Sequence, residues 1–228
     1  MPDLAAALAA APCFAALDEA AIADTARQCT VEEHDSGSII LSQDEACAGL
    51  GVVLNGRVRL LRSSPDGREQ VLRIAGPGRT FNEAAAIDGG GNPATVAAIL
   101  PSRVATLGRA WLMRLLDNHP GFCRTMLELA AARERSALQV AEDAALRSVP
   151  SRVARLLLRC ATADQHLIDG APDACERITQ QDIAELTGSV REVVQRALKQ
   201  LEQAGAIRLG RADVEVLDVD ALRAQASD

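Results

Sequence analysis

Two patterns of apolar residues divide the chain. Before residue 28, apolar residues recur at the spacing of an amphipathic helix. Between residues 30 and 108 they form short runs separated by Gly, Pro, Asn and Asp, which is typical of antiparallel strands joined by tight turns. One such turn, Asn55-Gly56, predicts a two-residue hairpin. This half of the chain is therefore expected to form a barrel or roll. The predicted strands are residues 38–41, 51–54, 58–61, 70–74 and 103–107.

Helical patterns return after residue 108. The segment 109–118 predicts a short helix that ends before Pro120. The segment 121–147 is rich in Ala and has no internal Pro or Gly, so it predicts one long helix. Small residues on one face let a second helix approach closely, so this helix either forms a dimer seam or packs on its own domain. The predicted dimer residues are Met126, Ala130, Ala137, Ala141 and Ala144.

The segment 178–216 holds the most informative pattern. Thr179 is followed three residues later by Asp182, and Ser189 by Glu192, so two capping boxes are predicted. They would open two helices, residues 180–186 and 189–204, joined by a short turn at Thr187-Gly188. An alternating segment follows and predicts a hairpin wing. The pattern indicates a winged helix-turn-helix, in which the second helix enters the major groove of DNA.

The second of these helices has side chains suited to reading bases. Arg can bind guanine through two hydrogen bonds, Glu can accept from cytosine, and Gln can bind adenine or a phosphate. Residues 189–211 contain five Lys/Arg against two Asp/Glu, whereas the whole chain has a net charge of −7. The alternative is a solvated helix face with a local ion pair. The predicted DNA-binding residues are Ser189, Arg191, Glu192, Gln195, Arg196 and Lys199.

Composition excludes several other classes of protein. Only 2% of residues are aromatic, which argues against binding by stacking of bases, and the acidic balance argues against non-specific coating of nucleic acid. The six Cys are scattered without zinc spacing, so reduced thiols in the cytoplasm are expected. No transmembrane segment or signal peptide is recognisable. No catalytic motif is found, so the protein is not expected to be an enzyme.

These features resemble the Crp/Fnr family of bacterial regulators. Residues 35–44 (DSGSIILSQD), 54–58 (LNGRV), the long helix and 188–196 (GSVREVVQR) follow the order of that family. The resemblance implies an α+β fold, with an N-terminal antiparallel, jelly-roll-like β-roll, a dimerisation helix and a C-terminal winged helix-turn-helix. It implies a homodimer on double-stranded DNA with TGTGA-like half-sites, contacting RNA polymerase. The expected domains are residues 1–120, 121–147 and 148–228, with a hinge near Ser148-Val-Pro150.

The expected effector site departs from the cyclic-nucleotide pattern of the family. The family's Phe-Gly-Glu is Phe81-Asn82-Glu83 here, and its phosphate-binding Arg-Ser falls near Pro93-Ala94. Arg is the natural partner of a phosphate, so its absence argues against cAMP as effector. The polar pair that meets the purine falls near Ala137-Leu138. The effector pocket is thus expected at Asn82, Glu83, Pro93, Ala94, Ala137 and Leu138.

Three alternatives for the N-terminal domain remain open. Haem-binding nitric-oxide regulators of the family also lack the phosphate Arg, which leaves a haem sensor of NO or CO possible, with His34, Cys13, Cys29 or Cys47 as axial ligand. The domain could instead be a cyclic-nucleotide-type ligand module, or it could bind nothing. An iron–sulphur cluster is not expected, because the N-terminal Cys are too far apart.

Overall fold

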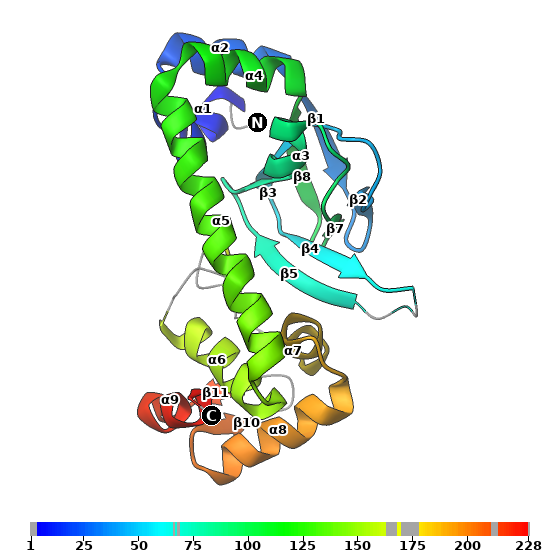
Figure 1. Ribbon diagram of the computed structural model, residues 1–228, viewed down its shortest axis with the longest axis vertical. Helices are drawn as coiled ribbons and strands as arrows, with labels where there is room; N and C mark the ends of the chain where they lie inside the picture. The colour runs from blue at the N-terminus through cyan, green and yellow to red at the C-terminus, as the bar shows by residue number, and fades with distance from the viewer. Residues whose placement is uncertain are drawn as a thin grey trace. The chain divides into compact units, whose positions relative to one another are not determined.

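The computed structural model describes residues 4–65, 67, 69–162, 168–169, 178–210 and 214–227. The chain divides into two compact units (Figure 1). Residues 1–62 and 74–135 form the first unit, and residues 63–73 and 136–228 form the second. Helices and antiparallel strands are both present, which confirms the α+β class.

The first unit begins with short helices. The predicted helical segment is divided into α1 (Leu4–Ala9), a 3-10 turn η1 (Pro12–Phe14) and α2 (Glu19–Gln28). Asp18 caps α2, because its carboxylate accepts a hydrogen bond of 2.8 Å from the Ala21 backbone N–H. The chain then enters the strands directly at Cys29.

Two antiparallel sheets confirm the predicted roll. The four-stranded sheet has the order β1-β8-β3-β6, and the five-stranded sheet has the order β2-β7-β4-β5-β9. All five predicted strands are present, whereas β1, β6, β7 and β9 were not predicted. In chain order the strands are β1 (Cys29–His34), β2 (Ile39–Leu41), β3 (Leu50–Asn55), β4 (Val58–Ser63), β5 (Glu69–Ala75), β6 (Thr80–Phe81), β7 (Thr95–Ala98), β8 (Ser102–Leu107) and β9 (Ile168–Asp169).

The turn at Asn55-Gly56 differs from the prediction. It joins β3 to β4, but these strands lie in different sheets, so they do not form a hairpin. Gly56 has φ of 83°, and a Cβ at this position would lie 2.4 Å from the Pro101 carbonyl oxygen. The neighbouring Arg57 N–H donates to the Ser102 hydroxyl at 3.0 Å. Contacts with residues 101–102 therefore turn the chain from one sheet to the other.

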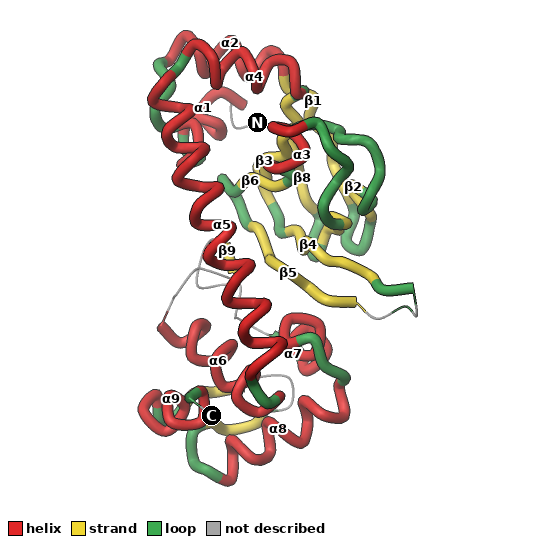
Figure 2. The backbone as a smooth tube through the Cα atoms, in the orientation of Figure 1, coloured by secondary structure: helices red, strands yellow, loops and turns green. Residues whose placement is uncertain are grey.

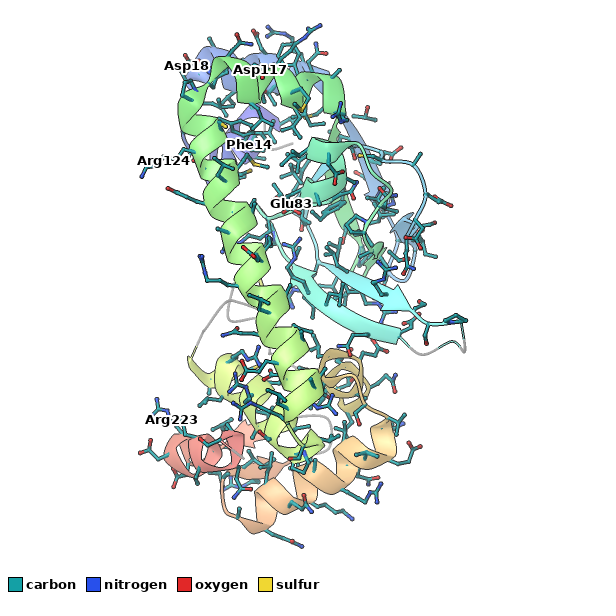
Figure 3. All side chains as sticks on the ribbon, in the orientation of Figure 1. Phe14, Asp18, Glu83, Asp117, Arg124 and Arg223 are labelled. Atoms are coloured by element: carbon teal, nitrogen blue, oxygen red, sulfur yellow. The ribbon has the colours of Figure 1, made fainter. Side chains whose placement is uncertain are left out.

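The core of the first unit lies between the N-terminal helices, the sheet and two later helices. These are α4 (Arg109–Asn118), which has the predicted bounds, and the first half of α5 (Pro120–Leu146). The rings of Phe14 and Phe122 stack with their centroids 5.6 Å apart, and Figure 3 shows Phe14 pointing into this core. Met126 is 2% exposed and belongs to the same cluster. It is therefore not free to form the predicted dimer seam.

The long helix and the break after it are as predicted. α5 ends at Leu146, and α6 (Val149–Thr162) begins three residues later. Pro120 and Pro150 each lie in the first turn of a helix, where the missing N–H costs no hydrogen bond. Proline thus opens both helices here.

The second unit is built around α6. This helix packs against α7 (Gln180–Thr187), α8 (Arg191–Gln203) and α9 (Val219–Ala226), and Figure 2 shows the short strands near α9. Those strands are β10 (Ile207–Leu209) and β11 (Val214–Val216). α9 was not predicted. None of the described helices is long and apolar enough to span a membrane.

The described cysteines are only partly as expected. Free thiols are present at Cys13, Cys29, Cys47 and Cys123. Cys160, near the end of α6, is disulfide-bonded, so the expectation of reduced thiols throughout is wrong.

Candidate nucleic-acid interface and ligand site

The first helix of the predicted motif begins with the expected capping box. The Thr179 hydroxyl accepts from the Asp182 N–H at 3.1 Å, and the Asp182 carboxylate accepts from the Thr179 N–H at 2.8 Å. Gly188, which directly follows α7, has φ of 61° and donates its N–H to the Ala184 carbonyl. A glycine suits this left-handed position because it has no Cβ.

The second predicted capping box is absent. The Ser189 N–H donates to the Ala184 carbonyl at 2.9 Å, so Ser189 completes the end of α7. Val190 is the N-cap of α8, without a side-chain hydrogen bond. The prediction of a capping box at Ser189 was wrong because the backbone N–H of Ser189 bonds to the last turn of α7. Glu192 still lies in the first turn of α8, where a negative charge interacts favourably with the helix dipole.

α8 has one buried face and one exposed face. Val194, Ala197, Leu198 and Leu201 are at most 1% exposed and pack into the second unit. The opposite face presents all but one of the predicted DNA-binding side chains to solvent, and Ser189, before the helix, is half-buried. The exposed ones are Arg191, Glu192, Gln195, Arg196 and Lys199.

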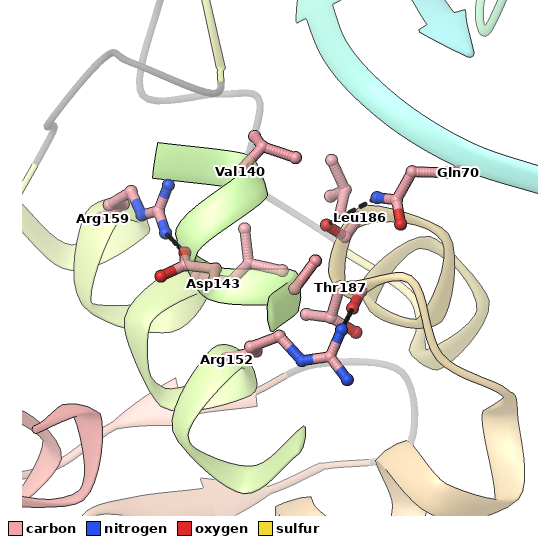
Figure 4. A pocket seen from close by; sticks show the side chains of 9 residues that line it. Gln70, Val140, Asp143, Arg152, Arg159, Leu186 and Thr187 are labelled. Carbon is pink, nitrogen blue, oxygen red and sulfur yellow. Dashed lines mark hydrogen bonds and ion pairs between the residues drawn. The ribbon is translucent and has the colours of Figure 1, made fainter. Parts of the chain in front are cut away.

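Two side chains far away in the sequence fix the end of α7. Arg152, on α6, donates from Nη1 to the Thr187 carbonyl at 2.6 Å (Figure 4). Gln70 donates from Nε2 to the carbonyls of Glu185 and Leu186 at 3.1 and 3.4 Å. These bonds satisfy carbonyls that a helix end leaves without partners. Neither residue was predicted, and no local pattern marks them.

The predicted wing is present as β10 and β11. Ile207 pairs with Val216 and Arg208 with Glu215, in antiparallel register. An ion pair of 3.1 Å joins Arg208 to Glu215, so part of the positive charge counted in this region is neutralised locally. Residues 211–213, which follow Gly210 in the predicted glycine-containing turn of the wing, lie outside the described residues.

Asn82 has a structural role at the predicted effector site. It is the N-cap of α3 (Glu83–Asp88) and has φ of 65°, a conformation that Asn tolerates better than most residues. Its side-chain N–H groups donate to the Asn92 side chain at 2.9 Å and to the Gly49 carbonyl at 3.0 Å. Asn82 and Asn92 are 4% and 2% exposed. This amide pair therefore joins segments of the roll.

Glu83 points toward two polar side chains of the first unit. The Thr80 hydroxyl donates to the Glu83 carboxylate at 2.6 Å, and Arg133 on α5 lies 3.6 Å from the same oxygen. Figure 3 shows Glu83 at the start of α3. The carboxylate thus links α3 to α5.

The guanidinium group of Arg62, which was not among the predicted effector residues, lies near the predicted phosphate position. Arg62, on β4, donates to the Pro93 carbonyl at 2.9 Å and lies 3.8 Å from the Asp44 carboxylate. Ala94 is 5% exposed. Arg62 is thus engaged by protein groups. The remaining predicted pocket residues, Ala137 and Leu138, are exposed on α5.

Two of the candidate haem ligands are thiols with a raised pKa. Burial, and then the charge of Glu83, raise the pKa of Cys13 to about 12, and burial raises the pKa of Cys29 to about 11. Both thiols are therefore protonated at neutral pH in the metal-free protein. His34 ends β1, with Nε2 at 3.9 Å from the Glu32 carboxylate. The described residues contain no cluster of three potential metal ligands.

Each half of the chain matches a known protein family. Residues 31–119 match the cyclic nucleotide-binding domain, and residues 151–225 match the Crp-like helix-turn-helix domain. The chain is 30% identical to the CRP-like cAMP-activated global transcriptional regulator of Mycobacterium tuberculosis, over 96% of this chain and 98% of that protein. It is also 30% identical to the cyclic AMP receptor protein of Thermus thermophilus, over 80% and 82%.

Solved structures share the fold. FixK2 from Bradyrhizobium japonicum matches with a TM-score of 0.71 and 22% identity, over 86% of this chain and 96% of that one. The c-di-GMP-responsive global regulator CLP of Xanthomonas campestris matches with a TM-score of 0.74 and 19% identity, over 88% and 100%.

Proposed function

Because the chain belongs to the Crp/Fnr family of DNA-binding transcriptional regulators, we propose that it binds, as a homodimer, a palindromic operator with TGTGA-like half-sites. The observation that supports this most directly is the exposed polar face of α8, with its buried apolar face against α6. In this proposal Arg191 and Arg196 contact guanines and Glu192 accepts from cytosine. Ser189, Gln195 and Lys199 bind phosphates or neighbouring bases.

The proposed dimer forms along α5. Ala130, Ala137, Ala141 and Ala144 are exposed, as a seam of small residues requires. Leu127, Leu138 and Leu146 are 66%, 64% and 76% exposed on the same helix. Large apolar side chains left in water favour association with a second copy. Leu127 takes the place of the buried Met126 in this proposal.

The proposed effector is not cAMP. Pro93-Ala94 offers no guanidinium fork for a cyclic phosphate, Asn82 is used within the protein, and Ala137 and Leu138 lack polar side chains for a purine. The two relatives above are named for cAMP, so this point needs a direct test. Calorimetric titration with cAMP should give no saturable heat. Micromolar binding would contradict the proposal.

Fluorescence anisotropy of the full-length protein tests operator binding. A TGTGA palindrome and a scrambled duplex of the same composition are titrated over a range of salt concentrations. We expect tighter binding to the palindrome at every salt concentration, with affinity falling as salt rises. Equal binding to both duplexes, with or without added effector, would contradict the proposal.

Two further parts of the proposal concern the cellular setting. The regulator acts in the cytoplasm, where it contacts RNA polymerase on the operator, and it needs no catalytic activity. In vitro transcription from a promoter with and without the palindrome tests the proposed contact with RNA polymerase. An operator-dependent change in transcript level is expected. Unchanged transcription from both templates, with the operator occupied, would argue against the RNA polymerase contact.

A further inference from the structure

The break between α5 and α6 is short. It consists of Arg147 and Ser148, which follow Leu146 and precede Val149. We call these two residues the joint. A few residues between two helices can absorb large changes of backbone dihedral angle, so a joint without further contacts would let α6 change its direction. Here, however, residues on both sides of the joint are bonded to other groups of the second unit.

One backbone carbonyl at the end of α9 accepts hydrogen bonds from the joint and from α6. The Ser151 hydroxyl, in the first turn of α6, donates to the Ala226 carbonyl at 3.2 Å. Arg147 donates from Nη1 to the same carbonyl at 3.4 Å and to the Ser227 carbonyl at 3.3 Å. The last carbonyls of a helix have no partner within it, and a cation beside them interacts favourably with the helix dipole. The end of α9 therefore holds the joint against α6.

These hydrogen bonds are shielded from water. Ser151 is 1% exposed and Ala226 is 5% exposed. The side chain of Arg147 is 20% exposed. α9 packs against α6 (Figure 1), and its Leu222 is fully buried. Loss of either donor would leave a buried carbonyl without a full set of partners, which is unfavourable.

Ion pairs also connect α5 directly to α6. Asp143, in the last turn of α5, has a side chain that is 10% exposed. Its carboxylate lies 2.9 Å from Nε of Arg155 and 2.8 Å from Nη2 of Arg159, both on α6, and Figure 4 shows the second of these pairs. The same carboxylate lies 3.5 Å from Nε of Arg147. Arg147 is thus held by α5 and donates to α9, so three helices are connected at the joint.

We propose that the end of α9 is a clasp that locks the joint and thereby sets the separation of the two reading helices in the dimer. This inference rests on the proposed binding of a palindrome by a homodimer. The clasp fixes the direction of α6, and of the α7–α8 pair packed on it, relative to residues 136–146 of α5. Two protomers joined along α5 then present their α8 helices at one separation, which must match the spacing of the half-sites. Arg147 and Ser151 are therefore positioning residues for DNA recognition, although neither lies on α8.

The dependence of binding on half-site spacing tests the clasp. Fluorescence anisotropy of the full-length protein is measured on the TGTGA palindrome, on versions with a central spacer one base pair shorter or longer, and on a duplex with a single half-site. The wild-type protein should lose at least about tenfold in affinity when the spacer changes, because one half-site is then rotated and shifted. The double variant Arg147→Gln/Ser151→Ala lacks both donors, so its loss should be less than about threefold. Its affinity for the single half-site should be unchanged, whereas a variant that is only less stable would lose affinity for every duplex equally.

Three further variants serve as rescue, control and milder change. Arg147→Lys should retain the wild-type dependence on spacing, because a lysine can also donate to the last carbonyls of a helix. Arg223→Gln is the matched control: it removes one positive charge from the second unit, but Arg223 pairs with Asp220 on its own helix. It should keep the wild-type dependence on spacing. Ser151→Ala alone should give an intermediate dependence, and it replaces the double variant if that protein does not fold.

Hydrogen–deuterium exchange tests the clasp without DNA. The Arg152 N–H, which donates to the Ser148 carbonyl at 3.0 Å, should exchange at least about tenfold faster in the double variant. Unchanged exchange, or a wild-type dependence on spacing in the double variant, would overturn the inference. Equal binding of the wild-type protein to all spacers would overturn it too. Faster exchange in the double variant, together with equal binding of the wild-type protein to palindrome and scrambled duplex, would instead contradict the proposed operator and with it the role of the clasp in spacing.

Discussion

Nη1 of Arg152 lies 2.6 Å from the Thr187 carbonyl oxygen, and this hydrogen bond ties the end of α7 to α6. Thr187 is 6% exposed, so water cannot readily replace the guanidinium. The position of α8 depends on this end of α7, because only Gly188, Ser189 and Val190 separate the two helices. Together with the bonds from Gln70, this long-range contact thus fixes the turn of the helix-turn-helix.

The first prediction concerns this contact. Arg152→Ala should lower the free energy of unfolding by about 1–3 kcal/mol, since a buried carbonyl loses a charged donor. Urea unfolding followed by circular dichroism measures the change. Arg27→Ala, on the exposed face of α2, should change the same quantity by less than about 0.5 kcal/mol. Equal effects of the two variants would show that the bond to Thr187 adds nothing.

The second prediction separates the two expected capping boxes. Thr179→Ala removes a cap that accepts from Asp182 N–H, so it should cost about 1 kcal/mol of stability. Ser189→Ala should cost much less, because Val190 is the N-cap of α8. Thermal unfolding of both variants in parallel gives the comparison. A larger loss for Ser189→Ala would mean that Ser189 caps α8 in solution.

The third prediction concerns base recognition by α8. Arg196→Ala should weaken binding to the TGTGA palindrome by about 1–3 kcal/mol and relax discrimination at one base pair. Anisotropy titrations against operators changed at single positions measure both effects. Equal losses on the palindrome and on a scrambled duplex would indicate that Arg196 contacts a phosphate only.

The fourth prediction concerns packing inside the roll. A Cβ at Gly51 would lie 2.2 Å from the Phe81 ring, which is 1% exposed. Gly51→Ala should therefore destabilise the protein by about 1–3 kcal/mol through overpacking. Gly108→Ala is the control, because its Cβ would meet nothing within 4 Å. Chemical unfolding of both variants is the measurement, and a neutral Gly51→Ala would mean that Phe81 can move aside.

The fifth prediction concerns alkaline pH. The pKa of Cys13 is raised from its ordinary value of 9.0 to about 12, mainly by burial. The folded state therefore binds this proton more tightly than the unfolded state, and the associated stability is complete below pH 9 and lost as pH rises toward 12. Cys13→Ala should flatten the fall in unfolding free energy over this window. An unchanged slope would contradict the assignment to Cys13.

Local sequence patterns determined much of the fold and of the candidate interface. The bounds of α4, the capping box of Thr179 and Asp182 and the exposed polar face of α8 all follow from residues a few positions apart. Helix periodicity and capping depend on residues close together in the chain, so they can be predicted from the local sequence. The class of protein followed from the same segments.

Other features depended on contacts between residues distant in the chain. Gly56 turns between sheets because of residues 101–102, and Met126 is buried by the N-terminal helices. The amide pair of Asn82 and Asn92, the Arg152 bond to Thr187 and the ion pair of Asp143 with Arg155 also join segments distant in sequence or separate helices. Such contacts produce no repeating pattern in the sequence, because they depend on how the whole core packs. The sequence by itself therefore determined the elements and the reading face, whereas the tertiary structure decided how the turns, buried polar groups and charges were used.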